Sequence, residues 1–133
     1  MHRLFLDANV LFSAAYRSES GLLRLWTLKD VELFTSDYAL EEARVNLETP
    51  EQRQRLSELA GSLEVVSGYP ELELPDEVVL PDKDKPILLA AVGVKATHLL
   101  TGDKTHFGRY FGLAVFGVLV LPPGEYLKMR IKD

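Results

Sequence analysis

The sequence predicts an α/β fold with a mainly parallel central sheet. Short apolar segments of strand length alternate along the chain with longer segments that have a helical pattern of apolar residues. This alternation is typical of parallel sheets whose strands are connected by helices. No internal repeat, low-complexity segment or domain boundary interrupts the 133 residues, so we expect a single domain over residues 1–133.

Strands are predicted where a short, mostly apolar run is bounded by polar or turn-forming residues. The first of these, Leu-Phe-Leu at residues 4–6, is apolar throughout, as buried parallel strands are. The predicted strands, in order, are residues 4–6, 31–35, 63–67, 97–101 and 113–121, the last interrupted by Gly117.

Helices are predicted between these strands from apolar spacing and from residues that favour helix ends. Ser36 or Asp37 suits an N-cap, and Pro86 suits a first turn, where a missing N–H costs little. Thr49-Pro50 ends one helix or restarts the next. The crowded apolar pattern of residues 21–29 predicts a helix packed in the core. In order, the predicted helices cover residues 10–16, 21–29, 38–47, 51–60, 87–94 and a last segment starting at 122–125, with 104–111 a short helix or loop and 68–81 a loop.

Composition places the chain among ordinary soluble proteins, with 47% hydrophobic and 26% charged residues. The absence of cysteine excludes disulfides and thiolate metal sites and is compatible with a reducing cytosol. The apolar runs are too short for a membrane span, and Asp7 interrupts the N-terminus too early for a signal peptide. We therefore expect a cytoplasmic protein without a membrane partner.

The net charge of −5 argues against a nucleic-acid binder that grips phosphates through a broad basic surface. It does not exclude an enzyme whose acidic cluster is neutralised by divalent cations, because the charge of the metal must be counted too.

Three aspartates are expected to meet at one edge of the sheet. Asp7 and Asp103 directly follow predicted strands, and Asp84 lies at the start of an apolar helix. Strand ends and helix starts coincide at the same edge of parallel α/β sheets, where ligands also bind. Taken alone, each aspartate could simply cap a helix or form a turn.

Glu42 is the fourth acidic candidate. At about 100° per residue, Ala39 and Ala43 lie on an apolar stripe, while Glu41 points nearly opposite to it. Glu42 and Asn46 lie one turn apart on the border of that stripe, where a side chain can look into a cleft. An unpaired surface glutamate is the simpler alternative.

Two further residues are weaker candidates. Asp82 could cap the same helix as Asp84, which is preferred because it lies nearer the helix. His106 follows Asp103 by three residues and could contact substrate, although a lone surface histidine is the commoner case. His2 and His98 are expected to be isolated residues with a structural or surface role.

Clustered carboxylates repel one another unless a cation joins them. Oxygen ligands in this number suit Mg²⁺ or Mn²⁺, bound as one or two ions. Such ions activate water and stabilise the oxygens of a phosphodiester displacement, so no Ser, Cys or His nucleophile is required.

Four segments, in this order, resemble those of PIN-domain nucleases of the VapC-toxin type. They are the Leu-Phe-Leu-Asp-Ala-Asn opening around Asp7, the helical Glu-Glu-Ala-Arg-Val-Asn segment around Glu42, the Asp-Lys-Asp-Lys-Pro segment around Asp84 and the Leu-Leu-Thr-Gly-Asp segment around Asp103. The resemblance implies a three-layer α/β/α sandwich around a mainly parallel central sheet. It implies metal-dependent cleavage of single-stranded or structured RNA that leaves 5′-phosphate and 3′-hydroxyl ends. It also implies that these four acids bind Mg²⁺ or Mn²⁺, with support from Asn9, Ser13, Asn46 and Thr101.

The resemblance also bears on partners. Many relatives are toxins neutralised by a small antitoxin protein, others have no antitoxin, and many are homodimers. The expected partners are therefore an RNA substrate, an antitoxin and a second copy of the chain.

Two other classes of function compete with this interpretation. Receiver domains and haloacid-dehalogenase-like phosphotransferases also place acids at strand ends. The latter expect an aspartate two residues after the first, where this chain has Asn9, and the third strand lacks the phosphoacceptor of a receiver. A non-catalytic PIN-like RNA-binding or protein-interaction module is the main alternative, although such modules tend to lose the acids.

Overall fold

A computed structural model describes residues 1–131, which form a six-stranded sheet in the order β3-β2-β1-β4-β6-β5. Neighbouring strands are parallel except for the antiparallel pair β5 and β6. The mainly parallel α/β fold predicted from the sequence is therefore confirmed. The strands are β1 (His2–Leu6), β2 (Val31–Ser36), β3 (Glu64–Val66), β4 (His98–Leu100), β5 (Ala114–Val115) and β6 (Val118–Leu121).

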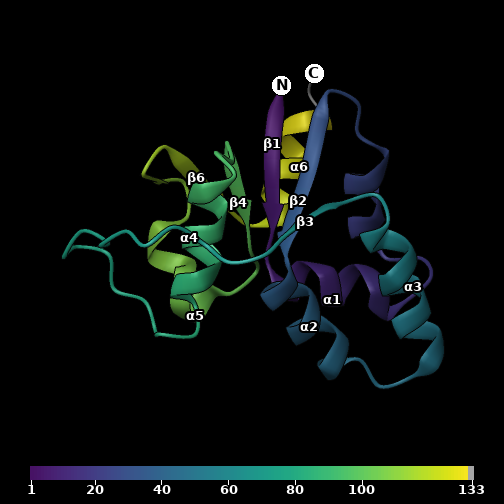
Figure 1. The fold of residues 1–133 in the computed structure, drawn as a ribbon. Coiled ribbons are helices and arrows are strands. Elements are labelled where there is room, and N and C mark those ends of the chain that lie inside the picture. Colours follow the sequence, from purple (N-terminus) through teal and green to yellow (C-terminus); the bar gives the residue numbers. More distant parts are fainter. Residues whose placement is uncertain (132–133) are drawn as a thin grey trace.

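Helices lie on both sides of this sheet, with α4 and α5 on one side and α1, α2 and α3 on the other (Figure 1). No helix within the described residues is long and apolar enough to cross a membrane. The α-helices are α1 (Ala8–Tyr16), α2 (Asp37–Asn46), α3 (Pro50–Ala60), α4 (Lys85–Gly93), α5 (Lys104–Phe107) and α6 (Pro123–Ile131), and the 3₁₀-helices are η1 (Gly21–Thr27) and η2 (Gly108–Tyr110).

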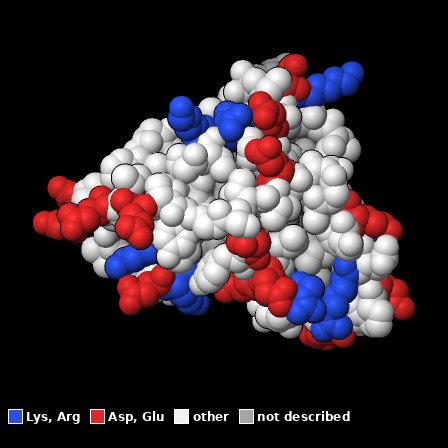
Figure 2. Space-filling view, viewed as in Figure 1, with Lys and Arg blue, Asp and Glu red and all other residues white. Residues whose placement is uncertain are grey.

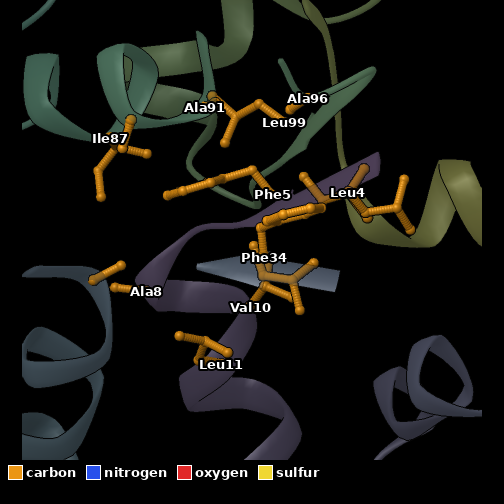
Figure 3. Packing of buried hydrophobic residues seen from close by; sticks show 14 of the residues in the cluster. Leu4, Phe5, Ala8, Val10, Leu11, Phe34, Ile87, Ala91, Ala96 and Leu99 are labelled. Atoms are coloured by element: carbon orange, nitrogen blue, oxygen red, sulfur yellow. The ribbon is translucent and has the colours of Figure 1, made fainter. Parts of the chain in front are cut away.

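Strand β1 runs through the centre of the core. Phe5 is fully buried and lies in register with Phe34 on β2 and Leu99 on β4. Ile87 of α4 packs on one side of β1 and Val10 of α1 on the other (Figure 3). This two-sided burial explains why the buried part of the strand, Leu4, Phe5 and Leu6, is apolar throughout. It also puts the residue that follows β1 at the middle of the sheet edge.

The predicted starts of the two helices between β2 and β3 are confirmed by cap geometry. Ser36 Oγ accepts a hydrogen bond of 3.1 Å from Ala39 N and caps α2. Thr49 and Gln52 form a reciprocal capping box at the start of α3, so Thr49-Pro50 separates two helices. These caps fix where α2 begins, and thus which residues of α2 reach the edge of the sheet.

The predicted single strand over 113–121 is wrong, because this segment is a hairpin of β5 and β6. Phe116 and Gly117 connect the strands with φ angles of 50° and 79°. Two consecutive positive φ angles in a two-residue loop are the geometry of a type I′ turn. Such turns favour Asn-Gly or Asp-Gly, so the apolar Phe116 hid the turn in the sequence.

The helix predicted over 21–29 is shorter and is a 3₁₀-helix, η1. Leu25 is its one fully buried side chain, while Leu22 and Leu28 are partly buried against the core. These three leucines are spaced by three residues, which suits the three-residue turn of a 3₁₀-helix better than an α-helix.

His2 and His98 are not isolated, contrary to the expectation from the sequence. Their ring centroids are 4.6 Å apart, and His2 Nδ1 lies 2.6 Å from the hydroxyl of Tyr126 on α6. Burial, followed by the neighbouring His2, lowers the pKa of His98 to about 4. The cluster lies where β1 and β4 begin, at the edge of the sheet opposite Asp7, and joins α6 to the sheet.

Candidate metal and catalytic site

A pocket of about 420 Å³ lies where β1 and β4 end, between α1 and α2 on one side and the starts of α4 and α5 on the other. All four acids singled out in the sequence line it. Convergence of strand ends and helix starts at one sheet edge brings together residues almost a hundred positions apart. The lining residues are Asp7, Ala8, Asn9, Phe12, Glu42, Ala43, Asn46, Lys83, Asp84 and Asp103.

Asp7 is buried at the end of β1, with 4% of its surface exposed. Its Oδ1 accepts a hydrogen bond of 2.7 Å from Ala8 N, which caps α1. Its Oδ2 accepts hydrogen bonds from Thr101 Oγ1 at 2.8 Å and from Asn9 Nδ2 at 3.1 Å. The side chain of Asp7 therefore both caps α1 and lines the acidic pocket.

Burial raises the pKa of Asp7 from 3.8 to about 6. The hydrogen bonds from Thr101 and Ala8 oppose this shift, and the charges of Asp84 and Glu42 add to it. A pKa raised by neighbouring carboxylates and desolvation is typical of a functional site that gains a cation.

Asn9 and Thr101 hold α1 against the turn that follows β4. Asn9 Oδ1 accepts a hydrogen bond of 2.7 Å from Gly102 N, and Asn9 Nδ2 donates to Thr101 Oγ1 at 3.2 Å. Thr101 Oγ1 also accepts from Asp103 N at 3.2 Å. Through these bonds Asn9 and Thr101, which were predicted to support the acids, fix the position of Asp7 relative to Asp103.

Asp84 stands at the N-cap position of α4, yet its side chain makes no capping hydrogen bond. Its Oδ2 is buried and has no hydrogen-bond partner among the described residues. Burial raises the pKa of Asp84, against the opposing charges of His106 and Lys83. The helix-capping explanation, which the sequence left open, therefore does not account for this carboxyl.

Asp82 does not join the pocket. Its side chain is 99% exposed and forms a 3.1 Å ion pair with Lys85 Nζ. The preference for Asp84 over Asp82 in the sequence therefore agrees with the geometry.

His106 lies between two carboxyl groups. Its Nδ1 is 2.9 Å from Asp103 Oδ2 and 3.0 Å from Asp84 Oδ2. Asp103 Oδ1 also accepts a hydrogen bond of 3.1 Å from His106 N, which caps α5. The sequence offered only the three-residue spacing from Asp103 as a signal for this arrangement.

Helix α2 brings Glu42 and Asn46 to the pocket. Glu42 is half-buried, and Asn46 Nδ2 donates a hydrogen bond of 2.9 Å to the backbone oxygen of Glu42. Glu41 instead points to solvent and pairs with Arg44 at 2.6 Å. The helical spacing in the sequence thus separated the two neighbouring glutamates correctly.

Tyr38 is a contact that sequence reasoning missed. Its hydroxyl donates a hydrogen bond of 2.8 Å to the backbone oxygen of Lys83, one residue before Asp84. Burial, then the charges of Glu42 and Asp84, raises the pKa of Tyr38, so the hydroxyl remains a neutral donor. This bond ties the helix that carries Glu42 to the segment that carries Asp84.

Ser13 lies outside the acidic pocket. It is exposed and lines a neighbouring pocket that shares Asn9 and Asp103 with the first. Phe12, which the sequence did not single out, lines the acidic pocket and stacks on Tyr16 with ring centroids 5.3 Å apart.

The donor set fits a divalent ion with oxygen ligands. The pocket combines several carboxyl groups, and one buried carboxylate oxygen lacks any hydrogen bond. Ligand atoms of Asp84, Asp103 and His106 lie within 4.8 Å of one another. These features suit Mg²⁺ or Mn²⁺, whose preferred ligands include carboxylate oxygens.

Comparison with known proteins agrees with this geometry. A sequence model of the PIN domain matches residues 3–105, which is most of the chain. The chain belongs to the PIN-domain family. A search of curated proteins finds no match.

The fold of this PIN domain is shared with a solved structure of VapBC2 from Rickettsia felis, described as bound to a DNA fragment from their promoter. The match has a TM-score of 0.68 and 18% sequence identity, and it covers 90% of this chain and 98% of that chain. At this identity the likeness concerns the arrangement of strands and helices.

Proposed function

We propose that this PIN-domain protein is a Mg²⁺- or Mn²⁺-dependent endoribonuclease. In this proposal Asp7, Glu42, Asp84 and Asp103 hold one or two divalent ions. The observation that carries it is the buried Oδ2 of Asp84, which has no hydrogen-bond partner in a pocket lined by the other three carboxyls. Bound divalent ions supply an activated water and stabilise the charge that develops on a phosphodiester.

The protein's own side chains orient this site. Thr101 and Asn9 donate to Asp7 Oδ2 and keep that carboxylate facing the pocket. Lys83 is the one cationic side chain that lines the pocket within residues 1–131. Its ammonium can pair with a phosphate oxygen of the substrate, while Phe12 offers an apolar surface beside the acids.

The surface charge supports a substrate held mainly at this pocket. Figure 2 shows acidic side chains over the loop between β3 and α4 and near α2, where basic side chains also gather, and the net charge of the chain is −5. A phosphate backbone is repelled by such a surface. RNA binding by this chain should therefore depend on divalent ions as strongly as cleavage does.

The second part of the proposal is that this chain acts as the toxin of a toxin–antitoxin pair. It rests on the PIN-domain assignment together with the fold shared with a VapBC2 chain. We also propose that an antitoxin covers the pocket and that the chain forms a homodimer. Residues 1–133 are proposed to form a single domain.

The direct test is cleavage of tRNA, rRNA and mRNA by the purified protein with Mn²⁺, with Mg²⁺ and with EDTA. We expect cleavage only with a divalent ion, and products with 5′-phosphate and 3′-hydroxyl ends. Asp84→Asn should abolish cleavage, whereas Asp82→Asn should retain it, because Asp82 is exposed and lies outside the pocket. Equal loss in both variants would contradict the assignment of the site.

Binding without cleavage is the outcome that favours the alternative function. If the wild-type protein bound RNA but never cut it with any divalent ion, the chain would be a non-catalytic RNA-binding module. For the toxin role, expression in bacteria should arrest growth with the wild-type chain and not with Asp84→Asn, and co-expression of a small protein encoded directly upstream should restore growth.

A further inference from the structure

A metal site made of carboxylates alone leaves the position of the His106 side chain unexplained. Its Nδ1 points at both Asp84 Oδ2 and Asp103 Oδ2, at 3.0 and 2.9 Å. The two carboxyls come from different parts of the chain, one at the start of α4 and one at the start of α5. An imidazole nitrogen directed at two acidic oxygens indicates a shared cation or a shared proton.

One proton cannot satisfy both oxygens. The imidazole Nδ1 carries at most one hydrogen, and its hydrogen bond is formed with Asp103 Oδ2. The contact with Asp84 lacks hydrogen-bond geometry, and Asp84 Oδ2 has no other partner although Asp84 is only 8% exposed. A buried carboxylate oxygen without a hydrogen bond is unfavourable, and a cation bound beside it would remove this cost.

The spacing of these atoms fits one coordination shell. In an octahedral site with bonds of about 2.1 Å, neighbouring ligand atoms are about 3.0 Å apart. The two contacts of Nδ1 have this length, and the three ligand atoms all lie within 4.8 Å of one another. The arrangement is therefore compatible with three ligands of a single ion.

The local backbone holds His106 in this position. The cap bond from His106 N to Asp103 Oδ1 joins the two residues, and the neighbouring Phe107 is buried with 1% exposure. Asp103 is itself tied to Thr101, whose hydroxyl accepts from Asp103 N. The imidazole is thus oriented before any ion arrives.

We propose that His106 Nδ1 is a metal ligand, forming with Asp84 and Asp103 a site of one nitrogen and two oxygens. Metal binding replaces the hydrogen bond to Asp103, because the ring then carries its hydrogen on Nε2 and keeps the lone pair of Nδ1 free. Imidazole favours transition-metal ions, whereas Mg²⁺ favours oxygen ligands. The site therefore selects Mn²⁺ over Mg²⁺. The inference rests on the proposed function only for the presence of an ion in the pocket, and its tests need no RNA.

The first test is pulsed electron paramagnetic resonance of the Mn²⁺-loaded wild-type protein. A directly bound imidazole gives a nitrogen coupling to the manganese. The coupling should change to that of ¹⁵N when only the histidines carry this label. The chain has three histidines, so His106→Gln should remove the coupling while His2→Gln, at the opposite edge of the sheet, should keep it.

The second test compares affinities by calorimetry. We expect His106→Gln to weaken Mn²⁺ binding about tenfold or more, as loss of groups that hold a metal does, and to change Mg²⁺ binding far less. An equal loss for both ions would overturn the selectivity, and an unchanged Mn²⁺ affinity would overturn the ligand role.

These outcomes separate the inference from the proposed function. RNA cleavage with Mn²⁺ but no histidine coupling in the labelled wild-type protein would refute ligation by His106 and leave the nuclease intact. Failure of the wild-type protein to bind Mn²⁺ at all would refute both. Because the labelled wild-type protein gives a result alone, a variant that fails to fold does not weaken the test.

Discussion

Asp7→Asn should abolish RNA cleavage and yet stabilise the metal-free protein at neutral pH. The pKa of Asp7 is raised from 3.8 to about 6, chiefly by burial. Each pKa unit corresponds to about 1.4 kcal/mol, so the ionised carboxylate costs the folded state about 3 kcal/mol above pH 6. Asparagine removes this charge without changing the shape of the side chain.

Part of the gain is offset by hydrogen bonding. An asparagine oxygen can still accept from Ala8 N, but its amide would face Thr101 Oγ1 and Asn9 Nδ2, where Asp7 Oδ2 now accepts. A mismatched hydrogen bond of this kind costs about 1–2 kcal/mol. The expected net stabilisation is therefore about 1–2 kcal/mol.

The effect has a definite pH dependence. The folded protein protonates Asp7 near pH 6, whereas the unfolded chain does so only near its ordinary value of 3.8. Because the folded state binds the proton more tightly, the wild-type protein loses stability from Asp7 as pH rises from about 4 to about 6. The advantage of the variant should be full above about pH 7 and absent below about pH 4.

Urea unfolding in EDTA, at about pH 7.5 and about pH 4.5, measures this difference. Asp82→Asn is the matched control, since its side chain is almost fully exposed and should show no such gap. With Mn²⁺ the order should reverse, because binding stabilises the wild-type protein by mass action. A variant less stable than the wild type in EDTA at the higher pH would refute the reasoning, as would a gap that does not change with pH.

Two further substitutions test the supports of the pocket. Thr101→Val removes the hydroxyl that donates to Asp7 at 2.8 Å, so it should raise the pKa of Asp7 further and shift the acidic limb of the pH–rate profile upward; an unchanged limb would contradict this. It should also destabilise the protein by about 1–3 kcal/mol, measured by urea unfolding, because buried partners lose their bond. Tyr38→Phe removes the 2.8 Å bond to Lys83 and should lower kcat/KM for RNA about fivefold, the equivalent of about 1 kcal/mol, with faster hydrogen exchange at residues 82–84. Unchanged exchange there would show that the bond does not hold this segment.

The position of the acids could be predicted because it depends on chain topology alone. In a parallel sheet, a residue just after a strand and one just before a helix meet at one edge, whatever the side-chain details. Asp7, Asp84 and Asp103 satisfied this rule in the sequence, and they line one pocket. Glu42 required helical spacing in addition, which separated it from the exposed Glu41.

Contacts between side chains could not be predicted in the same way. The bond between Tyr38 and Lys83 joins residues 45 positions apart, and it depends on how α2 packs against the loop before α4. The place of His106 between two carboxyls depends on the capped turn after Asp103. Neither contact has a pattern of spacing or composition that marks it.

The β5–β6 turn and the contact between His2 and His98 could not be predicted from the sequence either. Phe116 at a positive φ in the β5–β6 turn replaces the asparagine or aspartate that would have marked a hairpin. The pairing of His2 with His98 was missed because it requires knowing that β1 and β4 are neighbours in the sheet.

The two ends of the sheet have a consequence for how copies of this chain can associate. The outer strands are β3, with three residues, and β5, with two, and the exposed side chains of β3 include Glu64. Such short outer strands offer few free backbone groups, and the exposed charge of Glu64 on β3 further disfavours edge-to-edge pairing. If two copies associate, we therefore expect them to pack through helix surfaces rather than by joining their sheets into a longer one.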